Sequence, residues 1–395
     1  MADDTTMSAA EAADRLGISR ATLYAYVSRG LIESEPGPGP SRARLYPRAG
    51  IEGFAARRER ARDRDLAAHG SLHWGLPVLD SQLTLIEDGR CHLRGRELIA
   101  LSRAESLERV AALLWAGDPD AADGIFVPAS REAGAPRPPG SPAPSATALA
   151  SHLVAAGEES LLTLGAADPV VWRGGARVVS GLFAAAGAHG AGGLAAGLAR
   201  GWGVEGAREL EAALVLCADH ELNVSAFTAR CVASADAPLE AVVLAALCAL
   251  RGRRHGGLTD RVEALVHDAG REGAARAAER ALDADGVLPG FGHPLYPDGD
   301  PRAAELLRLA RVRTHDDVVE ALVERAREHL GEEPTLDLGL AALTRALGLP
   351  SGAAFCLFAL GRSVGWIAHA LETREDARLI RPRSRYRGPA PARVG

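Results

Sequence analysis

The chain has 395 residues, of which 47% are hydrophobic and 24% are charged, enough apolar content for one large core and a small extra domain. Its formal net charge is −6, so the molecule as a whole is not a general binder of polyanions, and contact with nucleic acid requires a local basic patch. None of its 45 basic residues is a lysine, which excludes a Schiff-base lysine and the lysine of a phosphate-binding P-loop.

The cysteine pattern and the N-terminus bear on the compartment. No two of the five cysteines stand at C-x-x-C spacing, so neither a zinc site nor a redox pair is indicated, and free thiols are typical of a reducing compartment. The N-terminus is acidic where a signal peptide would be basic, and residues 181–199 are too rich in Gly and Ala for a good membrane span. We therefore expect a cytoplasmic protein without membrane contact or metal.

The first 65 residues are predicted to form a unit of their own. Ser8 and Glu11 have the spacing of a capping box, and Gly17-Ile18-Ser19 ends the helix that follows. Ser19 can cap a second helix to about Arg29, and a Pro/Gly turn at 36–40 leads into a hairpin or wing. This order resembles the winged helix-turn-helix of the MerR and excisionase type.

Such a fold implies DNA binding through its second helix. Residues 42–64 hold eight Arg against three acidic residues, a basic stripe on an acidic protein. The alternative is a helical hairpin for dimer contacts followed by a solvated Arg-rich linker. On the second helix we expect Arg20, Thr22, Tyr26 and Arg29 to be exposed, and together with Arg42 and Arg44 they are the candidate DNA-binding residues.

Residues 66–395 are predicted to be mainly helical. Strand-like segments at 84–86 and 92–94 flank the turn Asp88-Gly89, and residues 128–147 are expected to form a flexible Pro-rich loop. We find no βαβ alternation and no Gly-rich phosphate loop, so a dinucleotide fold is not expected. Helical spacing covers 106–114, 148–164, 169–186, 204–216, 220–233, 238–251, 261–281, 302–309, 315–330, 337–347 and 353–372.

Several segments in the second half place His, Asp or Arg beside Gly or Pro turns. They are Asp219–Phe227, Arg254–Gly257, Gly290–Arg302, Pro334–Asp337, Gly361–Trp366 and Ile380–Arg383. In this order they resemble the citrate synthase family. The resemblance extends to residues 72–117, with Gly89, Arg94-Gly95 and the helix end Leu114–Gly117, and so covers about 72–388 apart from the Pro-rich loop.

The resemblance implies all-helical large and small domains, the small one at about 255–350, and condensation of acetyl-CoA with oxaloacetate and water to citrate and CoA. Thioester methyl protons are very weak acids, so a carboxylate removes one only if a donor holds the forming enol oxygen. By resemblance Asp337 is this base and His255 this donor, while His293 donates to the ketone of oxaloacetate. A neutral imidazole suits both histidines, since it donates a proton without adding a full charge.

A dicarboxylate substrate requires fixed cations, and Arg forks bind carboxylates bidentately. Arg302, Arg362 and Arg381 match the arginines that bind oxaloacetate in the family, and His220 matches its additional oxaloacetate-binding histidine. The family contributes the last arginine across a dimer interface, which implies a homodimer with a shared active site. It uses no metal or other cofactor, and acyl-CoA is a substrate.

The sequence also departs from the family pattern. Arg253-Arg254 precede His255 where Gly-Pro is usual, Leu258 replaces Ala, and Leu295 and Pro297 are unusual near His293. These positions lie near the acyl-CoA side, so propionyl-CoA, as in 2-methylcitrate synthases, is an alternative substrate. A DNA-binding metabolite sensor on a citrate-synthase body is a further alternative, although binding oxaloacetate alone would not require Asp337.

Overall fold

The computed structural model describes residues 5–28, 31–37, 44–55, 79–127, 145–159, 167–384 and 386–389. The chain divides into two compact units, Met1–Asp80 and Ser81–Gly395. The boundary we expected at residue 65 lies among residues 56–78, which are outside the described part of the chain.

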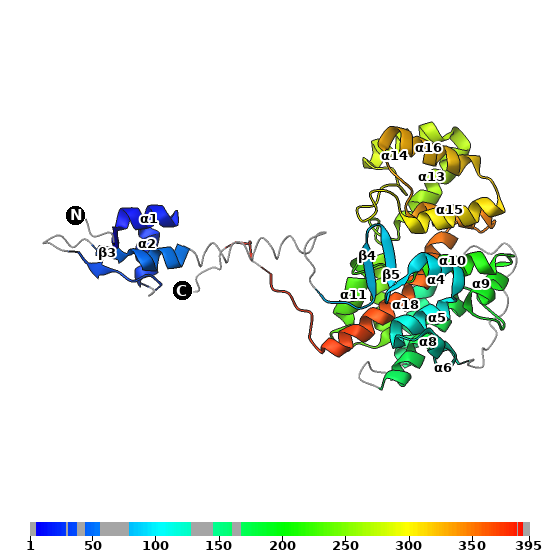
Figure 1. Cartoon of the computed structure of the whole chain (residues 1–395), viewed down its shortest axis with the longest axis horizontal. Coiled ribbons are helices and arrows are strands. Elements are labelled where there is room, and N and C mark those ends of the chain that lie inside the picture. Colours follow the sequence, from blue (N-terminus) through cyan, green and yellow to red (C-terminus); the bar gives the residue numbers. More distant parts are fainter. Residues whose placement is uncertain are drawn as a thin grey trace. The chain divides into compact units, whose positions relative to one another are not determined.

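The N-terminal unit has the predicted helix-turn-helix (Figure 1). Ser8 Oγ accepts from Glu11 N while Glu11 Oε2 accepts from Ser8 N at 2.8 Å, which completes the capping box. Gly17, in the left-handed conformation with φ 61°, ends the first helix. An antiparallel sheet of order β1-β3-β2 closes the unit around Leu23 and Tyr46. The elements are β1 (Thr6–Ser8), α1 (Ala9–Leu16), α2 (Arg20–Ser28), β2 (Glu35–Pro36) and β3 (Arg44–Pro47), and residues 48–55 are helical.

The larger unit starts with a three-stranded antiparallel sheet of order β4-β5-β6 and is otherwise helical. Asp88 and Gly89, with φ 50° and 70°, form the tight turn that was predicted between β4 and β5. The strands are β4 (Thr84–Glu87), β5 (Arg90–Leu93) and β6 (Arg96–Glu97). The first helices are α4 (Leu98–Ala104), α5 (Leu107–Ala116), η1 (Pro119–Ala121), α6 (Ala122–Ile125), α7 (Ala146–Glu159), α8 (Asp168–Ala185), α9 (Leu194–Trp202), α10 (Ala207–Cys217), α11 (Val224–Ala233) and α12 (Leu239–Leu250). The remaining helices are α13 (Leu258–Glu272), α14 (Ala274–Asp285), α15 (Pro301–Arg313), α16 (Asp317–Leu330), α17 (Leu336–Ala346) and α18 (Ala353–Asp376).

Helix α18 is the central element of the larger unit (Figure 1). It packs against α5, α8, α10, α11, α12 and α17, and nearly all of its residues are buried. By length and composition alone it could cross a membrane, but its most apolar window is entirely buried inside the protein. Helix α18 therefore forms the centre of the core of the larger unit.

The structure corrects several of the predicted elements. The single helix expected over 261–281 is two helices, because Gly273 has φ 92° and breaks the backbone between α13 and α14. Helix α9 was not predicted, because the Gly-rich segment before it hides where it begins. A Pro-rich loop was expected over 128–147. Its residues 128–144 lie outside the described part of the chain, and α7 begins at Ala146, within the expected loop.

Helices α13 to α16 gather at one end of the larger unit (Figure 1). Direct packing of α13 on α14 and α16, and of α14 on α16, makes this group a small helical subdomain. Its helices α13, α14 and α16 fall between residues 258 and 330, and the extent of the expected small domain, about 255–350, stays a prediction.

Close packing of α18 on α10 predicts a strong effect of substituting Gly361. A Cβ there would lie 2.4 Å from the Leu214 carbonyl oxygen and 2.8 Å from Cys217 Cβ. Gly361→Ala should therefore lower the free energy of unfolding by about 1 to 3 kcal/mol, although Ala favours helices. The matched control is Gly124→Ala in α6, where a Cβ meets nothing within 4 Å. Thermal unfolding, followed by circular dichroism, compares the stability of the two variants. Equal stability would contradict the close packing of α18 on α10 at Gly361.

Candidate active site

Backbone pairing brings the His293 loop against the segment that leads into α17. Thr335 N donates to Gly290 O at 2.8 Å, and Gly292 N donates to Glu333 O at 2.9 Å. Gly292 has φ 72°, a conformation that glycine adopts readily. Two segments that are far apart in sequence, carrying His293 and Asp337, are thereby held in one region.

Asp300 links Arg302 to helix α17. Its carboxylate accepts from Arg302 Nε at 2.9 Å and Nη2 at 2.8 Å, and also from Leu336 N at 3.1 Å. Burial alone would raise the pKa of Asp300, but the charge and hydrogen bonds of Arg302 lower it below its usual value. Because the pair uses Nε and one N–H of Nη2, Arg302 can offer a ligand both N–H groups of Nη1 and the second N–H of Nη2.

Three rings meet beside Arg302. The His220 and His293 ring centroids lie 5.4 Å apart, and Tyr296 lies 5.6 Å from His220 and 5.2 Å from His293. The Tyr296 hydroxyl is 2.9 Å from His220 Nε2, and the Arg302 guanidinium carbon is 5.4 Å from the Tyr296 ring centroid. His293 Nδ1 accepts from Leu295 N at 3.2 Å, so a neutral His293 carries its proton on Nε2.

Burial and the neighbouring guanidiniums keep both histidines neutral. Burial, followed by the charges of Arg302 and Arg362, lowers the pKa of His220 well below its ordinary value. For His293, burial and then Arg302 lower the pKa to about 4. At neutral pH both rings are therefore uncharged hydrogen-bonding groups.

His255 lies half-buried in the turn between α12 and α13. Its Nε2 is 2.8 Å from Ser225 Oγ, and its ring is edge-on to Phe358 with centroids 6.1 Å apart. Burial, and then Arg362, lower the pKa of His255 to about 3.

Gly256 and Gly257 lie in the same turn and have no room for a side chain. A Cβ at Gly256 would lie 2.6 Å from Leu250 Cδ1, and one at Gly257 would lie 2.3 Å from Arg251 O. The pair is therefore needed to close the turn back onto the end of α12, and not only to leave room beside a thioester.

Arg362 extends from α18 and is 1% exposed. Its Nε donates to Cys217 O at 2.6 Å, and its guanidinium carbon is 5.0 Å from the Phe358 ring centroid. Arg381, in contrast, lies in the exposed segment after α18 and outside the buried cluster. Ile380 N donates to Ser234 Oγ at 3.1 Å and attaches that segment to the end of α11.

Asp337 occupies the first turn of α17, where the helix dipole favours a carboxylate. Burial nevertheless raises the pKa of Asp337 to about 7; Arg302 opposes this shift and Asp300 adds to it. Its Oδ1 is buried and has no hydrogen-bond partner among the described residues. A carboxylate of this kind is partly ionised at neutral pH and can act as a base.

Sequence reasoning missed several groups that shape the site. Tyr296, Asp300 and Ser225 lie inside the quoted segments, where their closeness to His or Arg was the available signal. Of the buried network beside them only Asp219 lies in a quoted segment; Arg230, His369 and Glu372 fall on ordinary helical positions and gave no signal. In it Asp219 lies 3.2 Å from His369, whose Nδ1 accepts from Arg230 Nε at 2.9 Å, and Arg230 pairs with Glu372.

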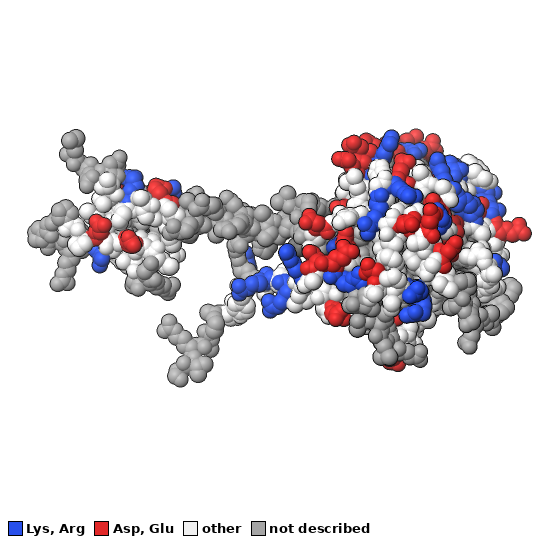
Figure 2. Space-filling model, turned by 60° about the horizontal axis from the view of Figure 1, so that its bottom comes forward, with Lys and Arg blue, Asp and Glu red and all other residues white. Residues whose placement is uncertain are grey.

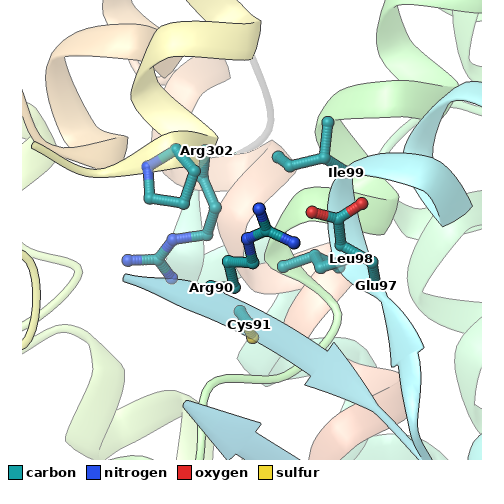
Figure 3. Close-up of a pocket in the computed structure, with 7 residues that line it drawn as sticks. Arg90, Cys91, Glu97, Leu98, Ile99 and Arg302 are labelled. Atoms are coloured by element: carbon teal, nitrogen blue, oxygen red, sulfur yellow. The ribbon is translucent and has the colours of Figure 1, made fainter. Parts of the chain in front are cut away.

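A small pocket borders Arg302 on its strand side (Figure 3). Its lining is Arg90, Cys91, Glu97, Leu98, Ile99, Pro301 and Arg302. None of the three site histidines lines it, so we do not assign substrate to it. Within the described ranges no group of three or more His, Cys, Asp or Glu could hold a metal ion.

The residues proposed for DNA contact lie on α2 and β3. Arg20 is exposed at the start of α2, and Arg44 on β3 donates to Ser34 O at 2.9 Å. Thr22 is half-buried, with Oγ1 2.8 Å from Ser19 Oγ. Tyr26 was expected to be exposed, but it is half-buried because it packs 5.4 Å from Phe54; Tyr24 is the exposed aromatic instead. Arg29 and Arg42 lie outside the described residues. On the face shown in Figure 2 both units carry acidic and basic side chains.

Two models of known protein families match the chain, one in each of its two units. Residues 193–383 match the family "Citrate synthase, C-terminal domain", and residues 6–59 match "Helix-turn-helix domain". The first match spans every candidate catalytic and substrate-binding residue, from His220 to Arg381.

Sequence relatives cover part of the chain. The chain is 36% identical over 185 residues to citrate synthase 2 of Bacillus subtilis, which is 45% of this chain and 50% of that protein. It is 34% identical over 191 residues to 2-methylcitrate synthase 2 of Corynebacterium glutamicum, 46% of this chain and 49% of that protein. The chain thus spans about half the length of the relatives it matches.

Solved structures extend the likeness to most of the chain. Citrate synthase from Thermotoga maritima matches with a TM-score of 0.67 and 24% identity, covering 81% of this chain and 96% of that one. The Thermoplasma acidophilum enzyme, solved as a ternary complex with carboxymethyl coenzyme A and oxaloacetate, matches with a TM-score of 0.66 and 21% identity, over 81% and 96% of the two chains. The protein therefore has the citrate synthase fold, and its residues 193–383 match the C-terminal domain of citrate synthases.

Proposed function

We propose that this protein condenses acetyl-CoA with oxaloacetate and water to give citrate and CoA. The observation that carries the proposal is the buried cluster of neutral histidines and arginines around Asp337, a carboxyl whose pKa is about 7. Acyl-CoA is a substrate in this reaction, and no other cofactor takes part. Five free cysteines support a cytoplasmic location.

The first step is removal of a methyl proton from the thioester. Asp337, as the carboxylate, takes this proton, and His255 donates a hydrogen bond to the thioester oxygen on which negative charge develops. A neutral His255 is suited to this because its pKa of about 3 leaves it uncharged, so it donates without drawing the carboxylate into an ion pair. A raised pKa also makes Asp337 a stronger base than an exposed carboxylate would be.

The second step is attack of the enol carbon on the ketone of oxaloacetate. His293 donates from Nε2, the nitrogen left with the proton because Nδ1 accepts from Leu295 N. Arg302 and Arg362 bind the two carboxylates of the substrate, with His220 beside them. Water then cleaves the resulting thioester and releases CoA.

The active unit is proposed to be a homodimer in which Arg381 completes the site of the partner. Arg381 is exposed and lies outside the cluster of its own chain, which supports this arrangement.

Replacing the base tests the function. Asp337→Asn should lower the rate of thiol release from acetyl-CoA and oxaloacetate by about 10²- to 10⁴-fold, the usual contribution of a general base. Oxaloacetate binding, measured by calorimetry, should persist, because the arginines that bind it are intact. The matched control is Asp236→Asn, an exposed residue with φ 58° that Asn tolerates. Unchanged turnover in the Asp337 variant would contradict the assignment.

The acyl chain is tested in the same assay. Propionyl-CoA in place of acetyl-CoA distinguishes citrate formation from 2-methylcitrate formation, since Leu258, Leu295 and Pro297 depart from the family pattern. A higher kcat/KM with propionyl-CoA than with acetyl-CoA would mean that the product is 2-methylcitrate and not citrate.

The pH dependence of kcat/KM for acyl-CoA follows from the ionisation of the base. The pKa of Asp337 is raised to about 7, so the active carboxylate is lost as pH falls below 7. Because His255 and His293 charge only near pH 3 and 4, we expect one acidic limb with a midpoint near 7 and a plateau above it. Stopped-flow rates between about pH 5 and 9 measure this profile; a limb centred near 4 would rule out Asp337 as the titrating group.

We propose DNA binding as a second activity, of the N-terminal unit. Three observations favour it: a helix-turn-helix closed by a sheet, an exposed Arg20 at the start of α2, and the helix-turn-helix family match over residues 6–59. The alternative is that the unit makes dimer contacts only.

Selection from a random DNA pool distinguishes these two roles. The full chain should enrich a defined sequence, and Arg20→Ala should abolish that enrichment because the start of a recognition helix contacts base edges. Arg15→Ala is the control, since Arg15 pairs with Glu52 at 2.6 Å within the unit. No enrichment by the wild-type chain would leave dimer contacts as the role of the unit.

A further inference from the structure

Arg362 is a buried guanidinium that, among the described residues, forms no ion pair of the kind that joins Arg302 to Asp300. Its Nε donates to a backbone oxygen, Cys217 O, at 2.6 Å, which satisfies one N–H group but supplies no negative charge. A buried cation without a counter-charge strongly destabilises a fold. The protein interior therefore requires a carboxylate close to Arg362.

Asp219 is the carboxylate that the chain brings to this part of α18. Its Oδ1 would lie 2.6 Å from a Cβ at Gly365 and is 3.2 Å from His369 Nε2. Residues 362, 365 and 369 share one face of the helix, and Cys217, which accepts from Arg362, is two residues before Asp219. The absence of a side chain at Gly365 thus lets the carboxylate approach α18 one turn after Arg362.

Both oxygens of Asp219 face neutral groups. Thr84 Oγ1 donates to Oδ2 at 2.5 Å. His369 Nδ1 accepts from Arg230 Nε at 2.9 Å, so a neutral His369 carries its proton on Nε2, toward Oδ1. Such neighbours orient the carboxylate but do not cancel its charge, and Asp219 is completely buried, so water does not screen that charge.

The other charges nearby agree with a pairing of Asp219 and Arg362. Arg230 is balanced by Glu372, with which it forms an ion pair. Burial alone would raise the pKa of Asp219, but His369 and Arg362 bring it below its usual value, so the carboxyl is ionised at neutral pH. Burial lowers the pKa of Arg362, and the charge of Asp219 opposes that shift. Each group therefore favours the charged form of the other.

We propose that Asp219 is a positioning residue that acts as the buried counter-charge of Arg362. It stabilises the site when no substrate is bound, and its negative charge opposes the binding of a dicarboxylate to the same guanidinium. The part that concerns oxaloacetate rests on the proposed function, whereas the pairing of charges in the free protein does not.

The test is Asp219→Asn, which keeps the shape of the side chain and removes its charge. The midpoint of thermal unfolding of the free protein should fall by about 5 to 10 °C, because Arg362 is left without a counter-charge. Oxaloacetate, measured by calorimetry, should bind about tenfold more tightly, the order of effect of one unit charge at an effective dielectric constant of about 20. A merely structural role of Asp219 predicts the opposite sign, since a disturbed site binds more weakly.

Glu305→Gln is the matched control. Glu305 is also buried, but it pairs with the exposed Arg103 and Arg308 and not with a substrate-binding arginine. This variant should lower the unfolding temperature without tightening the binding of oxaloacetate.

Arg362→Gln gives a second measurement that needs no ligand. Alone it should destabilise the protein, because Asp219 then lacks its cation, whereas the double variant with Asp219→Asn should be more stable than either single variant. The double variant keeps this comparison possible even if Asp219→Asn alone does not fold.

Weaker or unchanged binding of oxaloacetate to Asp219→Asn would overturn the proposal, as would losses of stability that simply add in the double variant. If the wild-type protein binds no oxaloacetate, the proposed function fails, and the stability comparison still decides whether Asp219 and Arg362 are paired.

Discussion

The buried ion pair between Arg302 and Asp300 is the contact on which the site depends. Asp300 accepts two bonds from the guanidinium and a third from Leu336 N, so one carboxylate orients the arginine and attaches it to the helix of Asp337. Breaking a buried pair of this kind by removing one partner costs about 3 to 5 kcal/mol, since it leaves an uncompensated charge. The pair therefore defines the geometry of the site as well as its charge.

Two buried guanidiniums set the electrostatics around that pair. Arg302 and Arg362 add to burial in lowering the pKa values of the histidines, so the rings are uncharged at neutral pH. Asp337 lies in the same environment, yet burial outweighs the attraction of Arg302 and its pKa rises to about 7. The same protein interior thus supplies fixed cations, neutral donors and a base, each by a different balance of burial and neighbouring charge.

Much of this arrangement could be predicted from the sequence. The helix-turn-helix followed from its capping box and Gly17, and the small sheet from the Asp88-Gly89 turn, because both depend on local chemistry. The site segments were found because His, Asp and Arg stood beside Gly and Pro in a family order.

Other features depend on contacts between residues far apart in the chain, which the local sequence pattern does not predict. The partners of Ser225 come from α18 and from the turn after α12, and the network of Asp219, Arg230 and His369 joins helices far apart in sequence. The helix break at Gly273 was missed because the apolar period continues across it. Tyr26 was assigned to the exposed face since its packing on Phe54 depends on tertiary structure.

In the proposed reaction, the residues grouped with Asp337 form a carbon–carbon bond between an acyl-CoA and oxaloacetate. Acetyl-CoA labelled with ¹³C at the methyl carbon, incubated with oxaloacetate and the wild-type protein, tests it directly by ¹³C NMR. We predict that the label appears in a methylene carbon of citrate. Labelled acetate, or label that stays in acetyl-CoA, would contradict the account, because the protein would then hydrolyse the thioester or leave it untouched.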